Sequence, residues 1–334
     1  MRCLVSLVVL VGALASAVAA HARPLRVATT TPNLGSIARA VGGEEVEVTT
    51  FARGGQDPHF VEPRPSFIRV LSRTDLFVMV GLQLELGWVP PLLRNARNSR
   101  IQPGGVGALD ASEGIPLLGV ATGVVDRSQG DVHAAGNPHY LTDPVNGIRV
   151  ARAIRDKLVV LRPEGEATFR ANATAFEAAV TQHLFGPEAV AEHGAAVLAE
   201  AALANRSDEL VPEDRLGGWL GRMRPHRGAT AIADHNIWPY FAKRFGFEVI
   251  GFLEPFPGIA PTTRHLGEVA EQMKAAGTSV ILSAAYFHPR YAEKVASATG
   301  ASVVFMADQV GAREGVDDYI AMIDWNVRRL ADAL

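Results

Sequence analysis

The sequence predicts an α/β protein with two lobes, each built on a parallel β-sheet, joined by a long linking helix. Short apolar runs that resemble buried strands alternate with helix-like stretches early in the chain, and the same alternation returns near its end. A long middle segment between these regions carries no convincing strand. The chain has 334 residues, which is enough for two medium-sized domains.

The N-terminal lobe is predicted from strand-like runs at residues 25–30, 46–51 and 76–81. Helix-like stretches begin at Pro32 and Pro65, where proline suits the first helical turn because its backbone angle is already fixed. The strand at residues 76–81 is continuously apolar, which is typical of a strand covered on both faces.

The C-terminal lobe repeats this pattern, with a turn or helix signal after each strand-like run. The runs are residues 228–233, 248–251, 279–283 and 301–306. Apolar residues between positions 146 and 200 follow helical spacing, with a break at Pro163, and predict the link between the lobes. The alternative, that these are ordinary packing helices of one domain, stays open from the sequence.

The first 22 residues are typical of a secretory signal peptide. A positive Arg2 precedes an apolar run from Leu4 to Val18 with small residues at its end, and Cys3 lies before that run rather than after it. We therefore expect a soluble periplasmic protein without a lipoprotein cysteine. The predicted division is residues 1–22 for the signal peptide, 23–145 for the N-terminal lobe, 146–209 for the linking helix and a helical excursion, and 210–334 for the C-terminal lobe.

Composition excludes several functions. With 32 basic and 35 acidic side chains the formal charge is −3, so a nucleic-acid partner is not expected. A single cysteine excludes a disulfide framework and a cysteine-rich metal site. Any metal must then be held by imidazole and carboxylate groups.

Two histidines lie in loops that proline makes rigid. His59 follows Pro58, and His139 follows Pro138 in a loop that leads into a helix. Proline lowers the entropy lost on binding, which suits an imidazole held ready for a ligand. Either histidine could instead be a loop residue bonded to a neighbouring carbonyl group.

Two further polar side chains follow strands of the C-terminal lobe. His235 comes directly after the run at residues 228–233, and Asp308 follows the run at residues 301–306. Ligands gather at the carboxyl ends of parallel strands, so these side chains could meet His59 and His139 between the lobes. Asp308 could equally cap the following turn. Three imidazoles and one carboxylate suit Zn²⁺, and Mn²⁺ less well because it prefers more oxygen.

The motifs together resemble the metal-binding solute-binding proteins of ABC transporters, in the cluster A-I or zinc-uptake periplasmic family. The resemblance covers essentially the whole chain after the signal peptide and rests on residues 57–59, 136–140, 235–246, 254–258, 299–301, Asp308 and Tyr319. It implies two α/β lobes joined by a long helix. It also implies that the metal ligands are His59, His139, His235 and Asp308.

The same resemblance implies a monomeric carrier, not an enzyme, that delivers a divalent metal to a membrane permease. A third histidine in place of a carboxylate points to Zn²⁺, with a manganese carrier as the alternative. The His-rich loop of many zinc members is reduced to His133, and His288 stands where relatives often carry aspartate; whether either binds metal stays open. Carboxylates that could orient the imidazoles are Asp57, Glu62, Asp143, Asp234 and Glu254.

Two other functions fit the sequence less well. A zinc hydrolase would need an open coordination position and a nearby general base, and neither the His-Glu-x-x-His nor the Gly-x-Ser-x-Gly pattern is present. A carrier of an organic solute would need a cleft lined by aromatic and amide groups, whereas aromatic residues make up only 7% of the chain.

Overall fold

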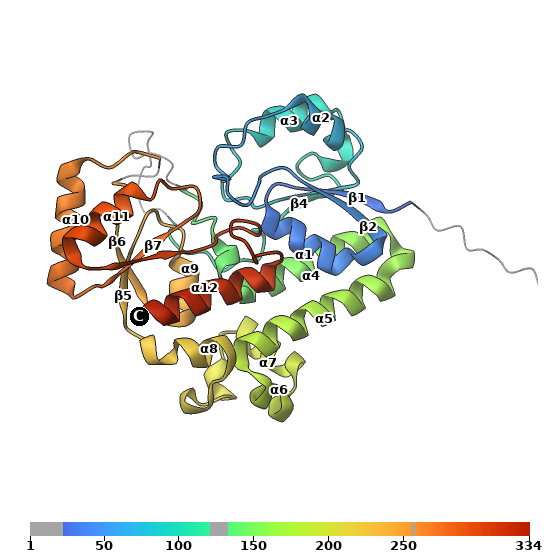
Figure 1. Ribbon diagram of the computed structural model, residues 1–334. Coiled ribbons are helices and arrows are strands. Elements are labelled where there is room, and N and C mark those ends of the chain that lie inside the picture. Colours follow the sequence, from blue (N-terminus) through green and yellow to red (C-terminus); the bar gives the residue numbers. More distant parts are fainter. Residues whose placement is uncertain (1–22, 121–132, 256–257) are drawn as a thin grey trace, which may run out of the picture.

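A computed structural model of the chain describes residues 23–120, 133–255 and 258–334 (Figure 1). It contains two four-stranded sheets whose paired strands are all parallel, with helices packed around them. The predicted fold class is confirmed. The expected signal peptide at residues 1–22 lies outside the described residues, and the division of the chain into domains stays a prediction.

The N-terminal sheet has the strand order β2-β1-β3-β4. Its strands are β1 (Leu25–Thr29), β2 (Val46–Thr50), β3 (Leu76–Met79) and β4 (Ala108–Asp110), and its helices are α1 (Pro32–Gly42), α2 (Pro65–Leu71) and α3 (Val89–Ala96). Val27 of β1 pairs with Val48 on one side and with Leu76 on the other, so β1 lies inside the sheet. The sequence did not predict β4, because three residues are too few to show a period.

The C-terminal sheet has the equivalent order β6-β5-β7-β8. Its strands are β5 (Thr230–Ala233), β6 (Glu248–Phe252), β7 (Val280–Ser283) and β8 (Ser302–Phe305), with helices α9 (Pro239–Phe245), α10 (Thr263–Ala276) and α11 (Arg290–Thr299). The loops after β5 and β8 carry His235 and Asp308, as the sequence predicted.

A helical layer connects the sheets. It consists of α4 (Pro144–Leu161), α5 (Glu166–Phe185), α6 (Pro187–His193), α7 (Ala195–Leu203) and α8 (Gly218–Met223), and the chain ends in α12 (Tyr319–Ala333). The break expected at Pro163 is a short turn, Pro163–Gly165, after which α5 packs along α4. In Figure 1 the red α12 passes from the C-terminal lobe towards α1 and α4.

One apolar core runs through both lobes. It includes Val27 of the first sheet, Val304 of the second, and Ile154, Phe176 and Ile323 of the helical layer, all buried. Because each lobe buries one face of its sheet against the same layer, separating the lobes would expose this core to water. We therefore expect small loop movements on ligand binding rather than a wide hinge closure.

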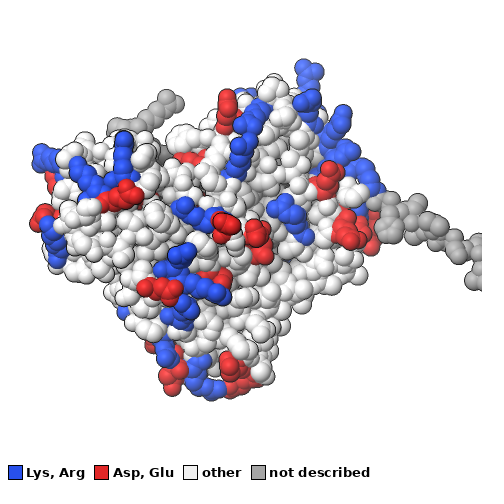
Figure 2. All heavy atoms as spheres, viewed as in Figure 1, with Lys and Arg blue, Asp and Glu red and all other residues white. Residues whose placement is uncertain are grey.

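The surface carries both signs of charge. On the face drawn in Figure 2, basic and acidic side chains are interspersed over most of the surface. Among the described residues no helix is long and apolar enough to cross a membrane.

The contact between α4 and α12 depends on a glycine. A Cβ atom added to Gly147 would lie 2.3 Å from the ring of Tyr319, and the Tyr319 hydroxyl donates to the carbonyl oxygens of Leu141 and Asp143. Gly147→Ala should therefore lower the free energy of unfolding by about 1–3 kcal/mol, because the ring must move out of a packed position. Chemical denaturation measures this change.

Gly267 in α10 supplies a matched control, since a Cβ atom there meets nothing within 4 Å. Gly267→Ala should stabilise the chain by about 0.5–1 kcal/mol through helix propensity alone. If both variants were equally stable, close packing at Gly147 would not be needed for the contact between the helices.

Candidate metal centre

His59 lies in the loop after β2 and is fixed by its neighbours. The carboxylate of Asp57 accepts from the backbone N–H of His59 at 2.9 Å and lies 2.7 Å from its Nδ1. The indole N–H of Trp88 donates to the carbonyl oxygen of Pro58 at 3.0 Å, which holds the loop from the other side. With Nδ1 facing Asp57, Nε2 is the ring nitrogen of His59 that would coordinate a metal, and it lies 3.0 Å from the Nε2 of His133.

His139 precedes the short helical turn Tyr140–Thr142 and is buried. Its backbone N–H donates to the side-chain oxygen of Asn137 at 2.9 Å, and its carbonyl oxygen accepts from the Thr142 hydroxyl at 2.8 Å. Its Nε2 atom is buried and has no hydrogen-bond partner within the described part of the chain. A buried ring nitrogen without a partner is an acceptor that a cation could satisfy.

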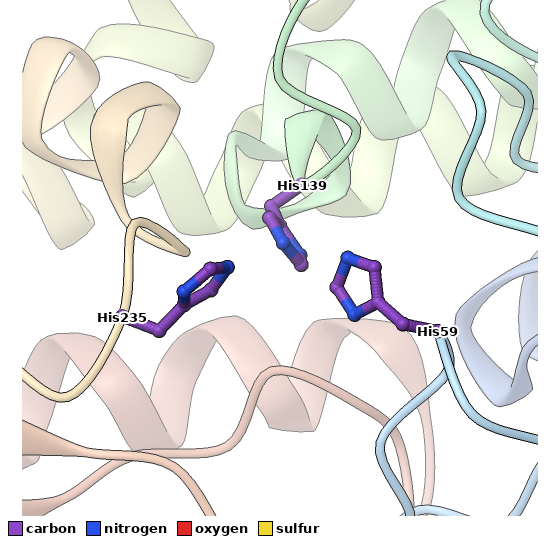
Figure 3. Close-up of side chains that lie close together, drawn as sticks. All are labelled: His59, His139 and His235. Atoms are coloured by element: carbon purple, nitrogen blue, oxygen red, sulfur yellow. The ribbon is translucent and has the colours of Figure 1, made fainter. Parts of the chain in front are cut away.

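His235 follows β5, and its Nδ1 lies 3.5 Å from the carboxylate of Glu254. His59, His139 and His235 each offer a ring nitrogen, and these nitrogens lie within 4.8 Å of one another. Figure 3 shows the imidazoles pointing towards a common centre from three separate segments. The structure thus brings together three of the four predicted ligands.

Asp308 lies in the loop after β8 and is buried, with 2% of its surface exposed. Neither of its carboxylate oxygens has a hydrogen-bond partner among the described residues. Asp308 is not part of the group whose ligand atoms lie within 4.8 Å of one another. The pKa of its carboxyl is raised to about 7, chiefly by burial and to a lesser extent by the charge of Asp57, while hydrogen bonding and the charge of His59 act in the opposite direction.

His139 is held in its neutral form. Burial lowers the pKa of His139 well below its usual value, and the neighbouring His59 and His235 lower it further. Burial also raises the pKa of Asp57, but the hydrogen bond and charge of His59 outweigh this and hold it below its usual value. Neutral imidazoles beside an ionised carboxylate are the form in which these side chains bind metals.

Buried amide side chains connect the loops of the two lobes. Asn33 of α1 donates to the carbonyl oxygen of Asp308 at 2.8 Å and accepts from the N–H of Val310 at 2.8 Å. Asn137 donates to the carbonyl oxygen of Asn236 at 2.7 Å. These contacts, which the sequence did not reveal, fix the loops that carry Asp308, His139 and His235 relative to each other.

The structure distinguishes His133 from His288, the two histidines whose part in metal binding the sequence left undecided. His133 lies against the centre, with its Nε2 3.0 Å from the Nε2 of His59. His288 is exposed, accepts from the N–H of Arg290 at the start of α11, and does not belong to the group of ligand nitrogens within 4.8 Å of one another. Nothing in the sequence could place His133, because it is separated from His59 by 74 residues.

Of the five carboxylates that the sequence suggested could orient the imidazoles, two face an imidazole in the structure. Asp57 and Glu254 face His59 and His235 respectively, as expected. The others have different surroundings: Asp143 pairs with Arg244, Asp234 accepts from the N–H of Ala284, and Glu62 lines a cavity beside His59.

The donor set fits a borderline divalent cation. Zn²⁺ binds imidazole nitrogens at about 2.0–2.1 Å in tetrahedral geometry, which places ligand nitrogens about 3.3 Å apart. The three nitrogens lie within 4.8 Å of one another, so modest rotations of the rings would bring them to that separation. Asp57 and Glu254 stand where outer partners orient ligating histidines.

Comparison with known proteins identifies the family. The model of the family "zinc-uptake complex component A, periplasmic" (ZnuA) matches residues 27–183 and 221–333. The manganese-binding lipoprotein MntA of Halalkalibacterium halodurans is 23% identical over 316 residues, or 93% of this chain and 88% of that protein. The iron ABC transporter substrate-binding lipoprotein MtsA of Streptococcus pyogenes is 21% identical over 317 residues, or 93% and 89%. These relatives are named lipoproteins, so the expectation of a chain without a lipid anchor is not supported.

Solved structures show the same fold. A crystal structure of ZnuA superposes with a TM-score of 0.68 at 20% identity, covering 93% of this chain and 99% of that one. A manganese-bound mutant of the periplasmic metal binding protein from Candidatus Liberibacter asiaticus has a TM-score of 0.67 at 18% identity, covering 93% and 99%. Together with the matched family model, these findings confirm the resemblance seen in the sequence. The chain belongs to the ZnuA family, whose members are metal-binding substrate-binding proteins of ABC transporters and not enzymes.

Proposed function

We propose that this chain captures Zn²⁺ outside the cytoplasm through His59, His139, His235 and Asp308 and delivers it to an ABC-transporter permease. The observation that carries the proposal is the convergence of three buried imidazoles from separate segments on one point. Asp308 would complete the site by turning its unpartnered carboxylate towards the cation. Four protein donors would enclose the metal and leave no position for a reacting water.

The donor chemistry favours zinc over manganese. Three nitrogen donors and one oxygen donor suit Zn²⁺, whereas Mn²⁺ is bound better by oxygen-rich sets. Relatives carry names that refer to manganese and iron, so the family alone does not decide the metal. A manganese carrier of the same type is the second candidate.

The proposed place of action is the periplasm, with a permease and its ATPase as partners. The family description is periplasmic, and the relatives are components of ABC transporters. We propose that the protein acts as a monomer, because the three imidazoles come from a single chain.

A competition titration tests the choice of metal. The metal-free protein should bind one equivalent of Zn²⁺, and excess Mn²⁺ should not displace it, because imidazole-rich sites prefer zinc. Bound metal is counted by elemental analysis, and the fluorescence of Trp238, buried beside the His235 loop, follows binding. Tighter binding of Mn²⁺ would support the second candidate, and no stoichiometric metal would overturn both.

Removing His139 should abolish tight zinc binding, because its unpartnered Nε2 lies at the centre of the cluster. His288→Ala is the matched control, since His288 is exposed and lies outside the cluster. Isothermal titration calorimetry should give a large loss of affinity for His139→Ala and wild-type affinity for His288→Ala. Similar affinities for the two variants would show that His139 is not a ligand.

The variant Asp308→Asn tests whether the Asp308 carboxyl has a raised pKa, because it changes how the stability of the metal-free protein depends on pH. The raised pKa of Asp308 means that the protonated form stabilises the metal-free fold and that this contribution is lost as pH rises through about 7. At about pH 8 the metal-free variant should be more stable than the wild type by up to about 4 kcal/mol, and at about pH 3, where the carboxyl is protonated in the unfolded chain as well, the two should be alike. Thermal unfolding measures both comparisons.

The same substitution should weaken zinc binding by at least about tenfold near pH 8, where the wild-type carboxylate is ionised. Wild-type affinity should fall as pH drops below about 7, because protons compete for Asp308, and more steeply than in the variant. Identical pH profiles of zinc affinity for the two proteins would remove Asp308 from the proposed ligand set.

A further inference from the structure

We infer that a small oxyanion, of the size of phosphate or sulfate, binds in a cavity between α4 and α9, where Arg149 and Lys243 hold it. The cavity has a volume of about 90 Å³, which is room for a few water molecules or for one such ion. Leu118 after β4, Asn146 of α4 and Tyr240 of α9 also line it, so three separate parts of the chain meet there. None of the three clustered histidines belongs to its lining.

The cavity has an excess of positive charge. Arg149, Lys243 and Arg244 line it. Asp143 is the one acidic residue of the lining among the described residues, so the formal charge is three minus one, or +2. Both oxygens of Asp143 are already engaged, because Nε and Nη2 of Arg244 donate to them at 2.9 Å each and the N–H of Val145 donates at 2.9 Å. The remaining charge belongs to Arg149 and Lys243.

Arg149 lacks the carboxylate partners of its neighbour on α4. Arg152 pairs with Glu177 and Glu200. Arg149 instead donates to the carbonyl oxygen of Leu203, and its Nε is buried with no hydrogen-bond partner in the described part of the chain. Burial lowers the pKa of Arg149, which means that its charge is held at a cost in free energy. A bound anion would offset that cost by pairing with the guanidinium group.

Two further side chains can donate to an anion. The Tyr240 hydroxyl accepts from the N–H of Leu118 at 3.0 Å, so its own O–H remains as a donor. Lys243 is exposed and forms no hydrogen bond or ion pair with the described residues, so its ammonium group can turn towards the cavity. A guanidinium, an ammonium and a hydroxyl group are donors that bind oxyanions strongly in proteins.

The cavity lies beside the turn that carries His139. Two of its lining residues hold that turn, because the backbone N–H of Asp143 and Nδ2 of Asn146 both donate to the carbonyl oxygen of Tyr140, at 3.1 and 3.0 Å. Tyr140 directly follows His139. An anion that joins α4 to α9 would therefore stabilise the helical layer against the C-terminal lobe next to this turn.

Calorimetric titration of the metal-free protein with inorganic phosphate, at constant ionic strength, tests the site. One phosphate ion should bind per chain, and the Tm should rise by roughly 4 °C at about a hundred times the Kd. Arg149→Gln should weaken binding by at least about tenfold, because it removes a charge-assisted donor. The control Lys274→Gln, which changes an exposed residue of α10, should bind phosphate as the wild type does.

Sulfate should displace phosphate, since both are tetrahedral. Tighter binding of malonate, a small dicarboxylate, would overturn the assignment to a tetrahedral oxyanion.

Phosphate also stabilises proteins without binding to them, because it is excluded from their surfaces. An equal rise in Tm for the wild type, Arg149→Gln and Lys274→Gln, with no one-to-one binding isotherm, would overturn the site. If Arg149→Gln is unfolded by circular dichroism, Lys243→Gln decides, because that side chain is exposed and forms no hydrogen bond with the described residues. Phosphate affinity unchanged in Lys243→Gln would then contradict the inference. All these measurements are made without metal, so their outcome is independent of the proposed function.

Discussion

The buried side chain of Asn33 fixes the relation between the lobes on which the candidate metal centre depends. Its amide uses both its donor and its acceptor on the loop after β8, so α1 of the N-terminal lobe holds the segment that carries Asp308. Losing this side chain would leave a carbonyl and an N–H without partners in the interior, at a cost of about 1–3 kcal/mol each. The shared apolar core acts in the same direction. Loops from both lobes can therefore present ligands in nearly final positions, which lowers the entropy lost on binding.

The centre also contains polar groups that the protein itself leaves unsatisfied. The Nε2 of His139 and both oxygens of Asp308 are buried without partners in the described part of the chain. Buried polar atoms nearly always have partners, and leaving them unpaired destabilises a fold. A cation would satisfy all three atoms at once, so binding should stabilise the folded chain by mass action as well as by new bonds. The same unpaired buried atoms thus destabilise the metal-free fold and favour the binding of a metal.

The sequence predicted those features that depend on local chemistry. Continuous apolar strands and the Pro-His turns at His59 and His139 are visible within a few residues, and the parallel topology places His235 and Asp308 after strands. Contacts between distant segments could not be predicted from the sequence. Asn33 and Asp308 are 275 residues apart, and His133 and His59 are 74 residues apart. Strand β4 was missed because three residues carry no periodicity. A fourth ligand at contact distance was expected, yet Asp308 stands outside the tight group of histidines.

Metal choice in such a protein must come from the donors rather than from the fold. Solved structures of very similar architecture include zinc-bound and manganese-bound proteins, so the two-lobe frame accommodates either ion. In this chain the carboxylates of Asp57 and Glu254 face imidazoles instead of the centre, so they strengthen nitrogen donors without adding oxygen ones. His133, with its Nε2 3.0 Å from that of His59, adds a further nitrogen beside the group. Each of these placements makes the site richer in nitrogen, and nitrogen is the donor for which zinc outcompetes manganese.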